Sequence, residues 1–245
     1  MKQTKLFQAL AFSAVFAMSA VHAADDKAAA PVKPEPYALG KTITKAVQAS
    51  VTPAQSIEIL KAGNERFVSG KSYQYDYKAQ VKQTGLGQYP LASIVACIDS
   101  RSAPEQVFNT GVGEIFDARV AGNTVNEDIL GSLEFAAKVA GSRSIVVLGH
   151  TSCGAIKGAC DNVKMGNLTG LLEKFMPAVN ATKTDGERNS KNYKFVHDVT
   201  VENVKFTVEK IRKMSPVLKE MEDKGQIKIV GAMLDVSTGK VDWLK

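Results

Sequence analysis

The sequence predicts an α/β fold with a mainly parallel sheet of four strands in the order 2-1-3-4, an additional edge strand and flanking helices. Residues 91–97 and 144–149 are nearly continuous apolar runs, which is typical of parallel strands covered on both faces. Segments with helical periodicity alternate with such runs along the chain. Cysteine and histidine residues follow two of the runs, at the end of the strand where doubly wound sheets bind their ligands.

Residues 1–23 differ in character from the rest of the chain. Lys2 and Lys5 precede a stretch of apolar and small residues, and small residues surround position 23. This pattern predicts a secretory signal peptide cleaved after Ala23, and hence a periplasmic or secreted protein. The apolar stretch is too short to span a bilayer comfortably, so we expect no membrane association after its removal.

The remaining chain divides into a short segment and one domain. Residues 24–50 are rich in alanine, lysine and proline and are expected to be flexible. Residues 51–245 are long enough for one domain with a sizeable core. Removal of the two lysines leaves 29 Lys and Arg against 25 Asp and Glu, a net charge of +4 with no basic block, so nucleic acid is not an expected partner.

The elements of the domain follow from caps and periodicity. Thr52 and Pro53 begin a helix that Gly70 ends, and Asn126 caps a helix that continues to residue 140. The polar and aromatic segment 73–88 is expected to wrap over a neighbouring surface. The strands are expected at 91–97, 113–118, 144–149 and 226–235, with the edge strand at 239–243; further helices are expected from Pro104 and at 154–160, 168–179, 193–214 and 216–224.

Three potential metal ligands follow the first and third expected strands. Cys97 ends the first strand, and His150 and Cys153 follow the third. Sulfur and imidazole ligands suit zinc, and they converge if the two strands are neighbours. Three protein ligands leave a fourth position for water, as in catalytic sites.

Asp99 and Arg101 lie just beyond Cys97. Asp99 either binds the metal or accepts a hydrogen bond from bound water, and Arg101 can hold its carboxylate with two hydrogen bonds. The alternative is that the pair only anchors a loop. Beside a zinc site, we favour the catalytic interpretation.

Three short motifs resemble the signatures of one enzyme family. They are Cys97-Ile-Asp-Ser-Arg101, Arg119-Val-Ala-Gly-Asn123 and His150-Thr-Ser-Cys-Gly154. In order and spacing they are similar to the motifs of the β-class carbonic anhydrases, and the similarity extends from about residue 53 to residue 245.

The resemblance implies a function and a set of site residues. It implies reversible hydration of carbon dioxide to bicarbonate and a proton by a zinc-bound hydroxide, with one Zn²⁺ per chain. The zinc ligands would be Cys97, His150 and Cys153, with Asp99 and Arg101 as the catalytic dyad and Asp99 a fourth ligand only in a closed state. The residues implied in substrate binding are Gln88, Gly154 and Phe135, the last standing where plant-like members carry tyrosine. The family also implies a homodimer or homotetramer.

Two positions assign the chain to a subgroup. Some bacterial members bind regulatory bicarbonate through a tryptophan and a tyrosine, where this chain has Ile94 and Leu234. The resemblance therefore implies a plant-like enzyme without bicarbonate regulation, and an open site at neutral to alkaline pH.

Two alternatives stay open at the level of sequence. Relatives on the same scaffold hydrolyse carbon disulfide or carbonyl sulfide with the same ligands. A non-catalytic, zinc-stabilised protein would instead have a fourth protein ligand to the metal and no exchangeable water.

Overall fold

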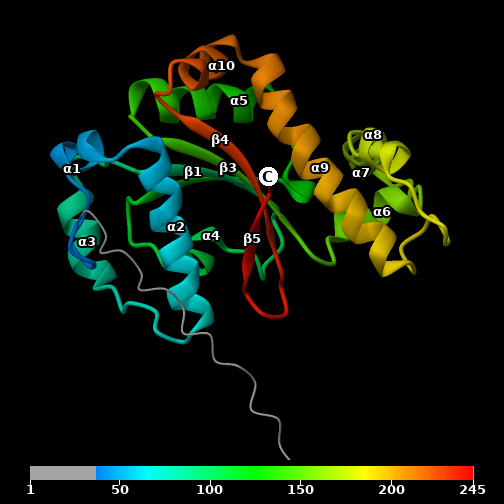
Figure 1. The fold of residues 1–245 in the computed structure, drawn as a ribbon, viewed down its shortest axis with the longest axis horizontal. Helices are drawn as coiled ribbons and strands as arrows, with labels where there is room; N and C mark the ends of the chain where they lie inside the picture. The colour runs from blue at the N-terminus through cyan, green and yellow to red at the C-terminus, as the bar shows by residue number, and fades with distance from the viewer. Residues whose placement is uncertain (1–36, 245) are drawn as a thin grey trace, which may run out of the picture. The chain divides into compact units, whose positions relative to one another are not determined.

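A five-stranded sheet forms the centre of the domain (Figure 1). The computed structural model describes residues 37–244, within a unit that spans Pro34–Lys245, so the predicted signal peptide lies outside the described residues. The sheet order is β2-β1-β3-β4-β5, and this confirms the predicted order and edge strand. The first four strands are parallel and β5 is antiparallel to β4. Their bounds are β1 (Ala92–Ala96), β2 (Ile115–Arg119), β3 (Ser144–His150), β4 (Lys228–Leu234) and β5 (Val241–Trp243).

Helices connect the strands. They are α1 (Lys45–Ser50), α2 (Pro53–Val68), α3 (Tyr77–Thr84), α4 (Pro104–Val107), α5 (Glu127–Glu134), α6 (Gly154–Cys160), α7 (Gly166–Glu173), α8 (Met176–Ala181), α9 (Tyr193–Met214) and α10 (Pro216–Asp223), with a 3₁₀ turn η1 (Ala121–Asn123) and a π-helix η2 (Phe135–Val139). The expected caps are present: Thr52 forms a capping box with Gln55 at the start of α2, and Asn126 accepts a hydrogen bond from the N–H of Ile129 at the start of α5. Within residues 37–244, no helix is both long and apolar enough to span a membrane.

Helices cover both faces of the sheet, as continuous apolar strands require. Side chains of α5, α9 and α10 pack with Val95, Ile145 and Val147 on one face. Side chains of α2 and of the α4 region pack with Ile94, Val146 and other residues on the opposite face. The central strands β1 and β3 are therefore fully buried, and their carboxyl ends are fixed in position.

The expectation of a flexible segment up to residue 50 is wrong for its last part. Residues 45–50 form α1, with Thr44 as its cap. The buried side chain of Gln48 donates hydrogen bonds of 2.8 Å to the carbonyl oxygens of Pro90 and Ala140. Both carbonyls belong to distant segments, so the sequence around residue 48 carries no local sign of this attachment.

Three other segments differ in detail from the expectation. Residues 73–88 contain the helix α3, whose Gln80 accepts a hydrogen bond from the N–H of Val112. The helix expected up to residue 140 ends as a π-helix, and the helix expected at 168–179 is divided into α7 and α8 by a break at Lys174 and Phe175.

Candidate metal centre

Cys97, His150 and Cys153 converge at the carboxyl edge of the sheet. Cys97 follows β1, His150 ends β3, and the pairing of β1 with β3 brings the two strand ends together. The ligand atoms of the three residues lie within 4.8 Å of one another. All three side chains are buried, so the predicted cluster brings one nitrogen and two sulfur atoms together away from solvent.

The histidine has one nitrogen available for a metal. His150 Nδ1 lies 2.9 Å from the carbonyl oxygen of Thr151, so Nδ1 carries the proton and donates it. Nε2 is buried and has no hydrogen-bond partner in the described part of the chain. A buried polar atom without a partner is costly, and a metal would remove that cost. Two cysteines and a histidine oriented by its other nitrogen form a set that fits zinc.

The buried thiols of Cys97 and Cys153 shift each other's pKa in opposite directions. The neighbouring Cys153 thiol lowers the pKa of Cys97 to about 4, and the N–H of Gly122, which donates to the Cys97 sulfur, acts in the same direction. The hydrogen bond with Cys97 and burial raise the pKa of Cys153 above its ordinary value. A coordinated metal would deprotonate both thiols, because thiolate is the form of cysteine that binds metals.

Asp99 and Arg101 form a pair beside this cluster. The Arg101 Nε and Nη2 atoms donate to the two carboxylate oxygens of Asp99 at 2.9 and 2.8 Å, and the Arg101 backbone N–H donates at 3.0 Å. These bonds hold the pKa of Asp99 well below its usual range, so the carboxylate is ionised. Asp99 Oδ2 lies 3.9 Å from His150 Nε2, which places an acceptor-only group next to the open side of the ligand set.

The second motif, at residues 119–123, holds the ligand loop. Arg119 Nε donates to the carbonyl oxygen of Cys97 at 2.9 Å, and Nη2 donates to that of Asp99 at 2.7 Å. The N–H of Gly122 donates to the Cys97 sulfur at 3.3 Å. The sequence indicated this motif as a signature but assigned it no role, because contacts from β2 to the loop after β1 require the tertiary structure.

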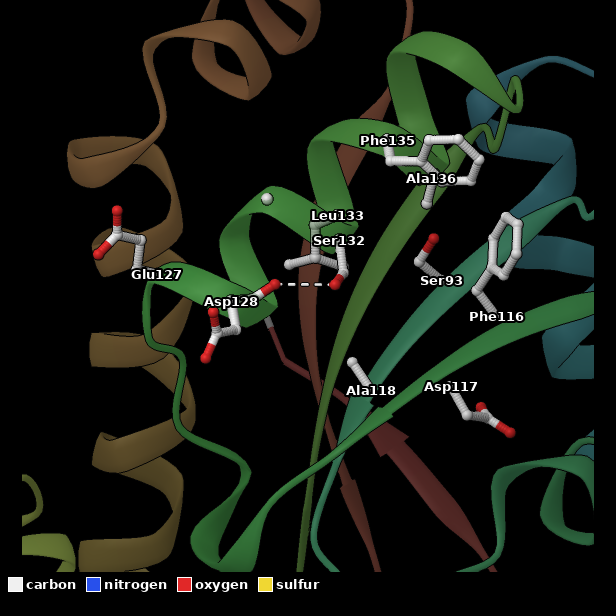
Figure 2. A pocket seen from close by; sticks show the side chains of 11 residues that line it. Ser93, Phe116, Asp117, Ala118, Glu127, Asp128, Ser132, Leu133, Phe135 and Ala136 are labelled. Carbon is white, nitrogen blue, oxygen red and sulfur yellow. Dashed lines mark hydrogen bonds between the residues drawn. The ribbon is translucent and has the colours of Figure 1, made fainter.

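The three expected substrate residues lie in different places. Gly154 begins α6 directly after Cys153, and the side of its Cα where a side chain would stand faces open space. Gln88 lines a hollow with Thr84 and Gly113. Phe135 lines another hollow with Phe116 and other residues of β2 and α5 (Figure 2). Neither hollow is lined by a ligand residue, so the single chain does not bring Gln88 and Phe135 to its own metal centre.

Comparisons by sequence agree on one family. Residues 92–241 match the family model described as carbonic anhydrase. The chain is 34% identical over 198 residues to carbonic anhydrase 2 of Mycobacterium tuberculosis, covering 78% of this chain and 92% of that protein. It is 28% identical over 179 residues to a carbonic anhydrase of Synechococcus elongatus, covering 69% of this chain and 65% of that protein.

Comparisons by structure agree on the fold. A β-carbonic anhydrase of Aspergillus fumigatus has a TM-score of 0.59 at 23% identity, covering 75% of this chain and 88% of that chain. One of two tetrameric β-carbonic anhydrases of Sordaria macrospora has a TM-score of 0.60 at 20% identity, covering 75% of this chain and 93% of that chain. Sequence and fold thus lead to the same assignment, and this chain belongs to the β class of the carbonic anhydrase family.

Proposed function

We propose that this carbonic anhydrase hydrates carbon dioxide to bicarbonate and a proton at the Cys97–His150–Cys153 centre, with one Zn²⁺ per chain. The observation that carries the proposal is the ionised Asp99, held by Arg101 3.9 Å from the free nitrogen of His150. A structural zinc site would need a fourth protein ligand, and Asp99 is engaged by Arg101 instead. The names of the relatives do not favour the alternative of a carbon disulfide or carbonyl sulfide hydrolase.

The residues of the centre divide the work. Zinc, when bound, would lower the pKa of water from about 15.7 to about 7. Cys97, His150 and Cys153 would hold the metal. Asp99, ionised and 3.9 Å from His150 Nε2, is placed to accept a hydrogen bond from an attacking water and so to orient it toward carbon dioxide. Arg101 keeps Asp99 ionised and occupies both of its carboxylate oxygens, which supports the open arrangement. Ile94 and Leu234, where regulated members carry tryptophan and tyrosine, support the absence of bicarbonate regulation.

Substrate binding is proposed for Gly154, Gln88 and Phe135. The N–H of Gly154, at the first turn of α6, has no acceptor within its own helix and is suited to a substrate oxygen. Gln88 and Phe135 lie in hollows apart from the centre of their own chain, so they would act at the centre of a second copy. This supports a homodimer or homotetramer, and the related Sordaria enzymes are described as tetrameric. Light scattering of the purified protein tests it, and a monomer would contradict it.

Export is a separate proposal. The pattern of residues 1–23 supports a signal peptide cleaved after Ala23 and a periplasmic or secreted enzyme. N-terminal sequencing of the protein recovered from the periplasm or the medium should begin at Ala24. An intact Met1 in the cytoplasmic fraction would overturn the proposal.

Zinc content and stopped-flow hydration kinetics test the function. The wild-type protein should bind about one zinc per chain through its three ligands and hydrate carbon dioxide much faster than carbon disulfide is turned over. Asp99→Ala should retain zinc but lose most of its activity. Asp223→Ala, which removes an exposed carboxylate paired with Lys219, is the matched control. Full hydration activity in the Asp99→Ala protein would overturn the mechanism.

A further inference from the structure

We propose that Asn203 of α9 is a positioning residue for the metal centre, acting through the turn at Gly122. This inference rests on the proposed role of Cys97 as a metal ligand. Asn203 does not touch the three ligand residues. It holds the carbonyl of Gly122, and the N–H of the same residue donates to the Cys97 sulfur.

The Gly122 N–H is aimed at the sulfur by an unusual backbone conformation. Gly122 has a φ of +71°, in the left-handed region that favours glycine. In that conformation its N–H lies 3.3 Å from Cys97 Sγ, within hydrogen-bond distance for sulfur. An N–H that donates to a ligand sulfur orients that sulfur, so the position of this turn affects how strongly Cys97 binds a metal.

Asn203 fixes the turn from the side of the helix. Its Nδ2 atom donates to the Gly122 carbonyl oxygen at 2.9 Å, and the side chain is only 3% exposed. Residues of α9 pack in the same core cluster as β3 and β4, so this helix is firmly held against the sheet. The hydrogen bond thereby ties the turn to the same framework that carries His150.

Phe175 also packs against the turn. Its side chain is fully buried, and a Cβ atom added to Gly122 would lie 2.4 Å from Cζ of its ring. The ring therefore packs directly against the Cα of Gly122. Phe175 lies between α7 and α8 and shares a core cluster with Cys97 and Cys153. This contact connects the segment from 161 to 192 with the metal centre.

Loss of the Asn203 amide should leave the Gly122 N–H less firmly positioned, while all three metal ligands remain. Partners in the outer shell of a metal site typically change metal affinity or activity by about 10- to 100-fold. We therefore expect the effect to appear first as faster metal loss, while zinc still binds in a ratio of one per chain.

The test compares two isosteric substitutions on one helix face. Asn203→Leu removes the donor to Gly122, and Thr207→Val removes a polar group at an equally buried position one turn further along α9. The zinc-loaded proteins are mixed with excess chelator, and zinc release is followed by a colorimetric indicator. We expect release from Asn203→Leu to be roughly 10-fold faster or more, and release from Thr207→Val to be close to that of the wild type.

A second readout reports on the sulfur itself. In the cobalt-substituted proteins, the sulfur-to-cobalt charge-transfer band should shift in Asn203→Leu and stay unchanged in Thr207→Val. Equal release rates and an unchanged band in Asn203→Leu would overturn the inference. A wild-type protein that binds no zinc would overturn the proposed function. A wild-type protein that binds zinc, with no change in Asn203→Leu, would overturn only the role of Asn203.

The wild-type protein provides a test that does not depend on folding of the variant. In the cadmium-loaded, ¹⁵N-labelled protein, the Gly122 amide proton should show scalar coupling to the metal through the N–H···S bond. An uncoupled Gly122 amide would overturn the inference. If Asn203→Leu does not fold, Asn203→Ala removes the same donor without adding a bulkier or charged group.

Discussion

Arg119→Lys is the perturbation that isolates the support of the ligand loop. Arg119 donates two hydrogen bonds, at 2.9 and 2.7 Å, to the carbonyl oxygens of Cys97 and Asp99. Lysine keeps the charge but lacks the rigid fork that reaches both carbonyls, so one bond is lost. A hydrogen bond that involves a charged group contributes about 1.5–3 kcal/mol.

This energy converts into an expected loss of activity. Since about 1.4 kcal/mol corresponds to a factor of ten, the loop should favour its native position about 10- to 100-fold less. We expect a decrease of that size in kcat/KM for carbon dioxide, measured by stopped flow on protein whose zinc content is known. The decrease should appear at full zinc occupancy, because all three ligands are intact.

Arg143→Lys is the matched control. Arg143 also donates to two carbonyl oxygens, those of Gln48 and Ala49 at 3.3 and 3.4 Å, but at a place remote from the ligands. The Arg143→Lys substitution should lower the free energy of unfolding modestly and leave kcat/KM unchanged. If Arg119→Lys had the same kcat/KM as Arg143→Lys, the proposed support of the ligand loop by Arg119 would be refuted.

Three further predictions concern stability. The hydrogen bonds with Arg101 lower the pKa of Asp99 in the folded protein. The ionised carboxylate therefore stabilises the fold at pH values above the pKa of about 4 that Asp99 has in the unfolded chain. This stabilisation is lost as the pH falls below about 4 toward the lower pKa of the folded state. The difference in unfolding free energy between wild type and Asp99→Asn, from urea titrations, should be constant from about pH 6 to 8 and shrink below about pH 4; a constant difference down to pH 2 would contradict this. Gln48→Leu should cost roughly 2 kcal/mol in the same assay, because the carbonyls of Pro90 and Ala140 lose their donor, and an unchanged midpoint would contradict the attachment of α1. Removal of zinc by a chelator should lower Tm by several degrees and zinc addition should restore it, since a metal that binds only the folded state stabilises it; a Tm insensitive to both would argue against the metal centre.

Local sequence signals were sufficient to predict those elements whose bounds are set by residues close to them in the chain. The range predicted for α9 from its apolar periodicity, residues 193–214, is the observed one, and the structure adds Asn192 as its cap. The expected convergence of Cys97, His150 and Cys153 depended on the first and third strands being neighbours in the order 2-1-3-4. The pairing of β1 with β3 and the proximity of the three ligand atoms confirm that condition.

The sequence was insufficient where distant contacts decide the structure. The helix α1 depends on the hydrogen bonds of Gln48 to Pro90 and Ala140, and α3 is held partly by the bond between Gln80 and Val112. Neither segment has a strong apolar period, so local propensity could not indicate them.

The contacts that hold the metal ligands in place are also long-range in sequence. Its contacts join Cys97 to Arg119 and Gly122, and Gly122 to Phe175 and Asn203, across separations that no periodicity records. Residue types at a strand end could therefore indicate the ligands, but not the groups that hold them.

The pairing of β1 with β3 also has a consequence for the order of events during folding. Cys97 and Cys153 are more than fifty positions apart in the chain, and the parallel pairing of two buried strands brings their ends together. Such long-range pairing forms slowly because a large loop must close first. The complete ligand set thus exists only after β1 and β3 have paired. If this pairing is completed late in folding, we expect zinc binding to slow unfolding more than it speeds folding, so that the bound metal would delay the opening of this edge of the sheet.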